Sequence, residues 1–351
     1  MDDQKTMPEA DFRSDNTGRV APELLEALVR ANSGTAFGYG ADEWTACLQR
    51  RFSELFETAV AVYPVATGTA ANALALAALS PSFGAVYCAP EAHVITAEAN
   101  ATGFFSGGAK LTPVAGAHGK LQCEALAAAL EVAGAGLAHR SQPAVVTLTQ
   151  ATDLGAVYTL DEVRAIAAVA KAHGLKMHMD GARFANALVR LGCSPAELTW
   201  RSGVDVLSFG VTKNGGLLGD AIVVFNPAAV TALPNQLRRA GLVWSKMRFA
   251  AAQLLAYVED ELWLRMAAAA NALAQRLAAG LSRIPGVELL APVEANELFL
   301  RLPGPVIDGL ERDGIRFYRR PGNIVRLVCR FDATAAEADA VITSLRRQLG
   351  G

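Results

Sequence analysis

Three short segments of the sequence carry residues that could do chemistry, and the first is a turn built from small residues. The run Val65-Ala66-Thr67-Gly68-Thr69-Ala70-Ala71-Asn72 follows an apolar stretch and opens a predicted helix. Small residues there allow backbone N–H groups and a hydroxyl to approach a phosphate at the positive end of the helix. Taken alone, this run is explained better as an ordinary strand-to-helix turn that Thr67 caps.

The second segment is His178-Met179-Asp180-Gly181-Ala182-Arg183, which places an acid at the end of an apolar strand. The carboxyl ends of parallel strands are where such sheets bind ligands. A buried carboxylate is costly unless a cation lies nearby, so Asp180 needs a positively charged partner. The alternative is that Asp180 caps a helix and Arg183 lies on the surface.

The third segment runs from Asp205 to Gly216 and contains a lone lysine, Lys213, between an apolar strand and a glycine-rich loop. A desolvated lysine loses its proton readily and becomes a nucleophile toward aldehydes. As an alternative, Lys213 is a solvated loop residue. A P-loop is excluded because Gly119-Lys120 is followed by Leu121, and no GxGxxG follows a strand.

Taken together, the phosphate cradle, the carboxylate and the lysine are the parts needed to hold pyridoxal 5'-phosphate. Lys213 follows Asp180 by 33 positions, which suits successive strands of one sheet. At this point the chain resembles the L-threonine aldolase family of fold-type I pyridoxal-phosphate enzymes, most closely its low-specificity bacterial branch.

The resemblance covers nearly the whole chain, and it rests on eight motifs in the right order. They are Arg13-Ser14-Asp15-Asn16, Gly38-Tyr39-Gly40-Ala41-Asp42, Ala66-Thr67-Gly68-Thr69, His93, Asp180-Gly181-Ala182-Arg183, Thr212-Lys213, Lys246-Met247-Arg248 and Val325-Arg326-Leu327-Val328. Each motif alone is weak, and their common order makes the resemblance specific.

The resemblance implies roles for the residues that match the family's cofactor site. Lys213 would be the Schiff-base lysine, Asp180 would pair with the pyridine nitrogen, and Arg183 would contact the phenolic oxygen of the ring. His93 would stack on the ring and serve in proton transfer, so Lys213, His93 and Asp180 are the implied catalytic residues. The other implied cofactor ligands are Gly68, Thr69, Thr212 and Arg248, and no metal site is expected.

The resemblance also implies a substrate site made of Ser14, Tyr39 and Arg326. Arg326 and Ser14 would hold the substrate carboxylate, Arg326 through the bidentate geometry that suits a planar anion. Tyr39 and Arg248 would enter the site from a neighbouring subunit. The alternatives are a partly exposed strand arginine for Arg326, and a packing residue for Tyr39.

The activity that the resemblance implies is retro-aldol cleavage of L-threonine, L-allo-threonine and other β-hydroxy-α-amino acids, such as phenylserine, to glycine and an aldehyde. Many threonine aldolases carry a histidine after the strand equivalent to Val145–Thr149, near the substrate hydroxyl. Here the segment reads Gln150-Ala151-Thr152-Asp153-Leu154-Gly155, without a histidine. The hydroxyl base is therefore open between His93, Asp153 acting through a water, and another group. His178 is interpreted as a packing residue.

Three other functions remain open. A β-eliminating lyase would use the same cofactor residues and release pyruvate, and a transaldolase would pass the glycine carbanion to a second aldehyde. A non-catalytic protein of the same fold would bind cofactor or a partner without turnover. Retention of Lys213, Asp180, His93 and Arg326 argues against the non-catalytic alternative.

Apolar runs alternate with helical patterns through the first two thirds of the chain, as a parallel sheet covered on both faces requires. The predicted strands of this part are Ala59–Val65, Gly84–Ala89, Ala144–Thr149, Leu175–Asp180 and Val204–Phe209, and the predicted helices are Thr69–Leu79, Cys123–Val132, Leu160–His173 and Ala182–Leu191. From Asn235 to Leu281 the chain reads helical almost throughout. Strand candidates Glu297–Leu302, Ile315–Tyr318 and Ile324–Cys329 and a helix Ala335–Leu349 follow.

This pattern predicts an α/β protein of two domains. Residues 1–245 would form a large cofactor-binding domain with a mostly parallel sheet, of the aspartate-aminotransferase-like type that the resemblance implies. Residues 246–351 would form a small α+β C-terminal domain.

The composition excludes several classes of protein. The chain has 351 residues with 32 basic and 34 acidic side chains, so it lacks the basic surplus of a nucleic-acid or membrane-surface binder. A hydrophobic share of 52% excludes disorder. The 33 residues from Thr58 to Pro90 carry no charge, but prolines and polar residues interrupt them, so we interpret them as buried interior.

Five cysteines without close spacing and a polar N-terminus, Met1 to Arg13, predict a cytoplasmic protein with reduced thiols. The apolar content exceeds what the core of one subunit needs, so we expect a homo-oligomer: a dimer with shared active sites, expected to pair into a tetramer.

Overall fold

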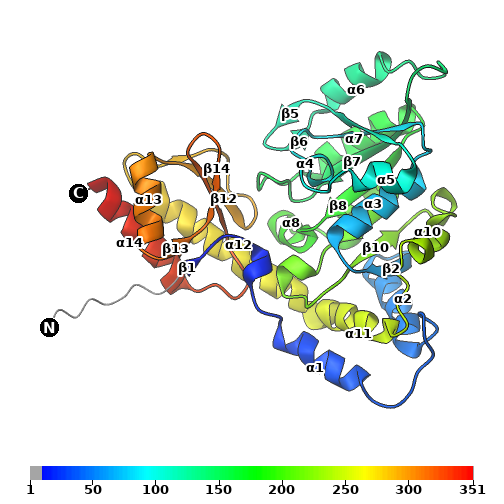
Figure 1. Cartoon of the computed structure of the whole chain (residues 1–351), viewed down its shortest axis with the longest axis horizontal. Helices are drawn as coiled ribbons and strands as arrows, with labels where there is room; N and C mark the ends of the chain where they lie inside the picture. The colour runs from blue at the N-terminus through cyan, green and yellow to red at the C-terminus, as the bar shows by residue number, and fades with distance from the viewer. Residues whose placement is uncertain (1–9, 351) are drawn as a thin grey trace.

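The computed structural model describes residues 10–350, so most of the predicted non-secretory segment Met1–Arg13 lies outside the described residues. A larger α/β part and a smaller α+β part are connected by the long helix α12 (Leu262–Leu281), as Figure 1 shows. The prediction of an α/β protein is confirmed.

The central sheet of the larger part has seven strands in the order β2-β10-β9-β8-β7-β3-β4. Every neighbouring pair is parallel except the pairs of β10, which runs antiparallel to both β2 and β9. The strands are β2 (Ala61–Val65), β3 (Gly84–Cys88), β4 (Lys110–Pro113), β7 (Gln142–Thr149), β8 (Lys176–Gly181), β9 (Val206–Phe209) and β10 (Asp220–Val224). The five strands predicted here are confirmed, each end within two residues, whereas β4 and β10 had no prediction.

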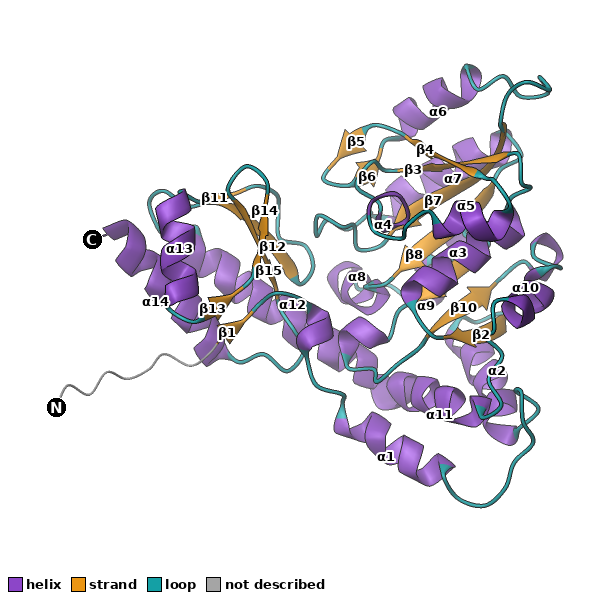
Figure 2. Ribbon diagram, viewed as in Figure 1, coloured by secondary structure: helices purple, strands orange, loops and turns teal. Residues whose placement is uncertain are grey.

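Helices cover both faces of this sheet (Figure 2). One hydrophobic cluster packs α3 and α10 against one face, and a second packs α2, α6, α7, α8 and α11 against the other. The helices of this part are α1 (Pro22–Ala31), α2 (Glu43–Leu55), α3 (Gly68–Leu79), α4 (His93–Thr96), α5 (Ala101–Ser106), α6 (Cys123–Glu131), α7 (Leu160–Ala172), α8 (Phe184–Leu191), α9 (Pro195–Leu198), α10 (Leu233–Arg239) and α11 (Met247–Val258). A small hairpin, β5 (Gly116–Ala117) and β6 (Lys120–Leu121), lies between β4 and α6.

Helix α3 explains the long uncharged stretch of the sequence. It begins after Thr67, whose side chain accepts a hydrogen bond from the backbone N–H of Ala70 (3.1 Å). Eight of its twelve residues are buried, because it packs on the sheet and under α5 and α10. The interpretation of Thr58–Pro90 as buried interior is confirmed for the middle of this segment. No helix within residues 10–350 is long and apolar enough to cross a membrane.

The smaller part contains an antiparallel sheet in the order β11-β12-β15-β14, with α13 (Gly304–Arg312) and α14 (Ala335–Gly350) packed beside α12. Its strands are β11 (Glu288–Leu289), β12 (Glu297–Arg301), β14 (Tyr318–Arg320) and β15 (Ile324–Val328). The predicted single strand Ile315–Tyr318 is wrong: β13 (Ile315–Arg316) pairs with β1 (Ala10–Asp11), whereas β14 pairs with β15. The chain changes sheets at Phe317, whose ring is buried in the small core.

The predicted continuous helix Asn235–Leu281 is interrupted twice. Residues 240–246 separate α10 from α11, and Asp260 and Glu261 adopt positive φ between α11 and α12. Helix α11 packs in the hydrophobic cluster of the central sheet, and α12 crosses from that cluster into the core of the smaller part. Ala10 and Phe12 also belong to the core of the smaller part. The hydrophobic cores therefore divide the chain inside α12, and we propose that position in place of the predicted boundary at 245.

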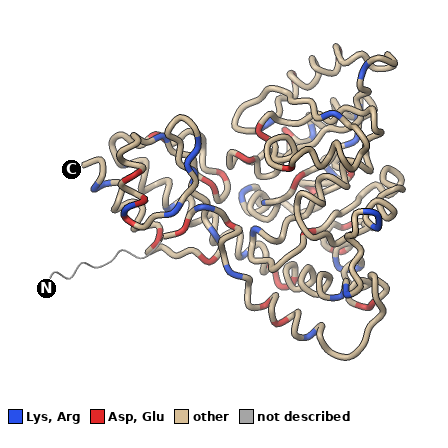
Figure 3. Tube along the Cα trace, viewed as in Figure 1, with Lys and Arg blue, Asp and Glu red and all other residues tan. Residues whose placement is uncertain are grey.

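Basic and acidic residues are interspersed over both parts of the molecule (Figure 3). The mixed signs agree with the near-neutral charge of the sequence. All five cysteines are free: Cys47, Cys88, Cys123, Cys193 and Cys329.

Candidate active site

A cavity of about 330 Å³ lies where β7, β8 and β9 end and α3 begins. It lies at the carboxyl ends of parallel strands, the position at which open α/β sheets bind ligands. Its lining residues are Asn16, Ala66, Thr67, Gly68, Thr69, Asn72, His93, Thr149, Asp153, Asp180, Ala182, Arg183, Gly210, Thr212, Lys213, Leu217, Leu218 and Asp220. The structure thus brings all three candidate segments of the sequence together.

Asp180 sits near the end of β8, and its carboxylate is buried but well supplied with donors. Oδ1 accepts from the backbone N–H of Ala182 (3.0 Å), and Oδ2 accepts from the side-chain amide of Asn72 (2.8 Å). These neutral donors fix the orientation of the carboxylate without cancelling its charge. It can therefore hold a protonated nitrogen in the cavity.

His93 opens α4 and is held by the buried Glu98, with 2.8 Å between Nδ1 and Oε1. The same Oε1 accepts from Asn72 (2.9 Å), so one amide links the support of His93 to Asp180. The hydrogen bond with Glu98 raises the pKa of His93 above its usual value, against the opposing effects of burial and of the Lys213 charge. The contact with Glu98 thus favours the protonated form of the imidazole.

The α3 end of the cavity is built around Gly68, Thr67 and Asp220. Asp220 opens β10, and its Oδ1 accepts from the backbone N–H groups of Val211 (2.7 Å) and Thr212 (3.1 Å). A Cβ on Gly68 would lie 3.4 Å from the other Asp220 oxygen, so the start of α3 passes close to this carboxylate. Thr67, Thr69 and Thr212 line this end of the cavity at the positive end of α3, a position suited to an anion.

Lys213 lies in the short 3-10 turn η3 (Thr212–Asn214) that follows β9. The turn is anchored from behind, because the Asn214 amide donates to the Tyr257 hydroxyl (2.8 Å) and to the Trp263 carbonyl (2.9 Å). The Lys213 side chain is half-buried and has no hydrogen-bond or ion-pair partner within residues 10–350. Its amine is therefore free to react with a bound molecule.

A buried charge cluster closes the side of the cavity next to the smaller part. Arg183 donates from Nε to Asp15 Oδ2 (2.7 Å) and lies 3.0 Å from Glu297 Oε1 through Nη2. Burial raises the pKa of Asp15, but the charges of Arg183 and Lys213 outweigh burial and hold it below its usual value. Arg326 joins the cluster at 3.7 Å from the same Glu297 oxygen. This cluster ties the start of α8 in the larger part to β12 and β15 of the smaller part.

The structure places seven predicted site residues around the cavity: Gly68, Thr69, His93, Asp180, Arg183, Thr212 and Lys213. Four others do not line it. Ser14 is buried beside it, where Oγ accepts from the Asn16 N–H (3.2 Å). Arg326 is half-buried, with its Nη2 donating to the Arg13 carbonyl (3.1 Å) and its Nε without a hydrogen-bond partner.

Tyr39 and Arg248 do not line this cavity. Tyr39 lines a second hollow of about 330 Å³ beside the edge strand β2, and Met247, the residue before Arg248, lines the same hollow. The Tyr39 ring is 58% exposed and lies under the guanidinium of Arg238, 5.0 Å from the ring centre. Arg248 donates to the Gly34 carbonyl (3.4 Å), while its buried Nε has no hydrogen-bond partner. Within one chain these two residues cannot reach the Lys213 cavity, so their roles stay predictions about a neighbouring subunit.

Several site residues escaped the sequence reasoning. Asn72 and Glu98 support Asp180 and His93, and Asp220 supports the turn of Lys213. Glu297 was hidden inside a predicted strand, although a lone acid in the apolar run 295–300 was a signal for a buried partner. Such supports are set by side chains that meet across strands, which spacing along the chain does not reveal.

His178 is fully buried and bridges three strands. Its Nδ1 lies 2.8 Å from the Thr147 hydroxyl on β7, and its Nε2 lies 2.9 Å from the Ser208 hydroxyl on β9. It is not part of the cavity lining. The structure thus agrees with the interpretation of His178 as a packing residue.

This burial predicts a stability that depends on pH. Burial lowers the pKa of His178 from 6.5 to about 4, against the charge of Asp180. Between these two pKa values His178 is protonated in the unfolded chain and neutral in the folded protein. The free energy of unfolding is therefore highest above the pKa of the unfolded chain and decreases as the pH falls below it. From pH 7 to pH 5 we expect a loss of about 2 kcal/mol from this residue. Urea unfolding at pH 7 and pH 5 measures this loss of stability. In His178→Gln the loss between the two pH values should be smaller by about 2 kcal/mol. An equal loss in the variant and the wild type would contradict this role of His178.

Comparison with known proteins places the chain among enzymes. The family described as "Beta-eliminating lyase" matches residues 11–303. The low-specificity L-threonine aldolases of a Pseudomonas species and of Pseudomonas aeruginosa are each 45% identical to it, over 95% and 97% of this chain and 96% and 98% of theirs. The solved threonine aldolase of Leishmania major has a TM-score of 0.90 at 27% identity, covering 97% of this chain and 99% of that one. The chain belongs to the β-eliminating lyase family, in its branch of low-specificity L-threonine aldolases.

Proposed function

We propose that this protein cleaves L-threonine, L-allo-threonine and related β-hydroxy-α-amino acids to glycine and an aldehyde, with pyridoxal 5'-phosphate as cofactor. The observation that carries the proposal is the convergence of an unpartnered lysine amine, a hydrogen-bonded carboxylate and a histidine in one cavity at the end of the sheet. Membership of the family and the names of the Pseudomonas relatives support it.

The residues present fit this cofactor. The free amine of Lys213 matches its aldehyde, Asp180 matches its ring nitrogen, and the open α3 terminus at Gly68 matches its phosphate. The volume of about 330 Å³ lies within the range of small-molecule sites. When bound, the cofactor supplies an electron sink for the bond pair released at the substrate Cα.

The protein residues then divide the remaining work. Lys213 would bind the cofactor aldehyde, Asp180 would keep the ring nitrogen protonated, and His93 would cover the ring. Gly68, Thr69 and Thr212 would hold the phosphate, and Arg183 would contact the phenolic oxygen. Arg326, whose Nε has no partner, receives the substrate carboxylate with Ser14 close by.

We further propose a homo-oligomer in which Tyr39 and Arg248 complete the site of a neighbouring subunit. The largely exposed Tyr39 side chain supports this proposal, as does the buried Nε of Arg248, which has no hydrogen-bond partner within residues 10–350. Tyr39 and Met247, the residue before Arg248, line the same hollow next to β2. Light scattering of the purified protein tests the expected dimer or tetramer.

The activity has a direct test. Purified protein with added cofactor is incubated with threonine, allo-threonine or phenylserine, and the aldehyde is reduced by an alcohol dehydrogenase whose NADH consumption is followed. We expect aldehyde and glycine in equal amounts. Pyruvate without aldehyde would overturn the proposal in favour of a β-eliminating lyase, and transfer of glycine to a second aldehyde would add the transaldolase reaction.

A further inference from the structure

We propose that Asp153 is the base that accepts the β-hydroxyl proton of the substrate, and that His93 does not perform this step. The inference rests on the proposed retro-aldol function and assigns the proton acceptor that this function requires. It is argued from the position of Asp153, from its surroundings and from the state of His93.

Asp153 is presented to the cavity by a tightly held loop. The loop leaves β7 at Thr149 and turns at Thr152, whose N–H donates to the Ala156 carbonyl (2.8 Å) and whose hydroxyl donates to the His118 carbonyl (2.8 Å). Gly155 has a φ of 79°, and a Cβ there would come within 3.1 Å of the Glu297 carbonyl. The loop is therefore packed against β12, and its geometry is fixed before a ligand arrives.

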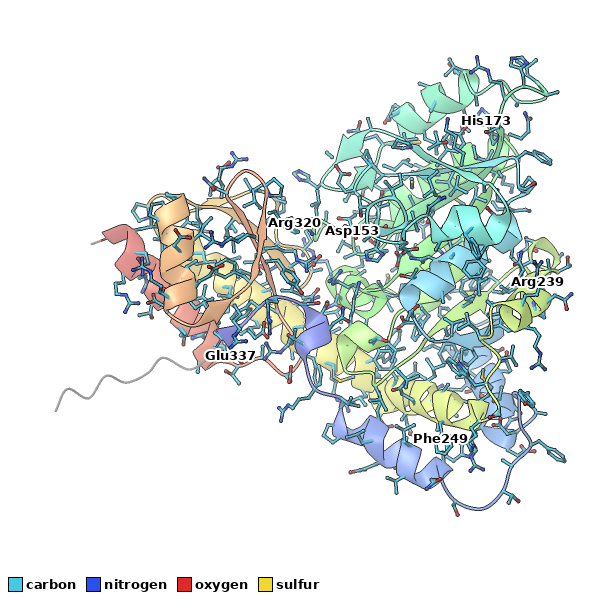
Figure 4. All side chains as sticks on the ribbon, viewed as in Figure 1. Asp153, His173, Arg239, Phe249, Arg320 and Glu337 are labelled. Atoms are coloured by element: carbon cyan, nitrogen blue, oxygen red, sulfur yellow. The ribbon has the colours of Figure 1, made fainter. Side chains whose placement is uncertain are left out.

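The Asp153 carboxylate makes none of the hydrogen bonds that hold this loop. It lines the same cavity as Lys213, Asp180 and His93, and it has no hydrogen-bond or ion-pair partner in the part of the chain that the structure describes. Figure 4 shows it on the side of the larger part that faces the smaller one. A half-buried carboxylate without a partner, aimed into the reaction space, is free to accept a proton from a ligand.

The charges around Asp153 suit a base. Burial, together with the charges of Asp180 on β8 and Glu297 on β12, raises its pKa to about 6. Lys213 on η3 and Arg183 before α8 oppose this increase. At neutral pH the group is mostly ionised, yet it is more basic than an ordinary aspartate, which is the condition for efficient general-base catalysis.

His93, the alternative base, is committed elsewhere. Its Nδ1 is bound to the buried Glu98, and this contact raises the pKa of the imidazole above 6.5. The Glu98 contact favours the protonated imidazole, and in that form both ring nitrogens are donors, so the ring has no acceptor for the hydroxyl proton. A cation at this position instead suits the stabilisation of negative charge.

The proton and electron balance of the step is simple. The hydroxyl proton moves to a carboxylate oxygen of Asp153, directly or through one water, while the O–H pair becomes the second bond of the aldehyde C=O. The Cα–Cβ bond breaks, and its electron pair remains with Cα. Cα then takes up one proton, so glycine and the aldehyde together contain every atom of the substrate, and Asp153 returns to the carboxylate.

The test compares threonine cleavage with a second reaction that uses the same active site but does not remove a hydroxyl proton. Exchange of the glycine Cα proton with deuterium requires the cofactor, Lys213 and the carboxylate site, but no hydroxyl base. For Asp153→Asn we expect a loss in kcat for threonine cleavage of about 10²- to 10⁴-fold, with glycine exchange, followed by NMR, within about threefold of wild type. Full aldol activity in Asp153→Asn, or an equal loss of both reactions, overturns the inference. Absence of both reactions in the wild type overturns the proposed function instead.

A second measurement needs neither cofactor nor turnover. In protein labelled with ¹³C at the aspartate carboxyls, the signal that Asp153→Asn removes should titrate near pH 6 in the cofactor-free protein. The wild-type kcat/KM for threonine should fall in acid with the same midpoint, and Glu297→Gln should move that midpoint downward because a like charge is removed. In His93→Asn the residual activity should keep this acidic limb. A carboxyl midpoint near the ordinary aspartate value, or loss of the limb in His93→Asn, overturns the inference.

Discussion

Replacement of Lys213 by alanine is expected to abolish the visible absorbance of bound cofactor and to lower threonine cleavage by on the order of 10³-fold or more. The reason lies in the geometry of the site. Lys213 presents an unpartnered amine at the end of β9, on a turn that Asn214 anchors to Tyr257 and Trp263. Without that amine the cofactor aldehyde has no covalent attachment point in the cavity.

Two further variants test whether the reactive amine of Lys213, rather than its positive charge, is required. Lys213→Arg keeps the positive charge but cannot deprotonate, so it should be as inactive as Lys213→Ala. Lys171→Ala, at an exposed position near the end of α7, removes a lysine remote from the cavity and should behave as wild type. Reduction of the wild type with borohydride should trap the cofactor on Lys213, as peptide mass mapping would show. Near-normal activity in Lys213→Arg would mean that only the charge matters.

Replacement of Arg183 by methionine is expected to produce the largest loss of stability, about 3–5 kcal/mol. The Arg183 side chain is 7% exposed, and its partners Asp15 and Glu297 are almost fully buried. Removing the cation takes away the ion-pair partner of Asp15 and leaves Glu297 with the more distant Arg326 alone, at 3.7 Å. Because the cluster joins the start of α8 to the smaller part, urea unfolding should show a lower midpoint. The cofactor should also bind more weakly.

The matched control is an exposed ion pair of the same chemistry. Arg276 and Asp339 are each about half exposed and lie 2.8 Å apart, so Arg276→Met should cost less than about 1 kcal/mol. The Asp15 pKa, held below 3.8 in the folded protein, gives stability that is present above this value and lost as pH falls below it. In Arg183→Met that acid-induced loss should shrink. Equal midpoints for the two methionine variants would contradict the role of the cluster.

The sequence by itself determined the elements of the sheet and the three segments that meet at the active site. Strands buried on both faces are continuous apolar runs, so β3, β7, β8 and β9 could be read directly from composition. The carboxyl ends of parallel strands lie at one edge of a sheet, so Asp180 and Lys213 could be expected near each other. The chemistry of Asp180 and Lys213 follows from their residue types, and the roles of the other predicted site residues came from the family resemblance.

Only the tertiary structure decided which groups support these residues and which are free. Glu98, Asn72, Asp220 and Glu297 come from different elements, and their pairings depend on side chains that meet across the sheet and between the two parts. The split of Ile315–Tyr318 between two sheets likewise depends on where β1 docks. The raised pKa of Asp153 comes from burial and from the charges of Asp180 and Glu297, which are close in space and distant in sequence, so spacing along the chain could not reveal it.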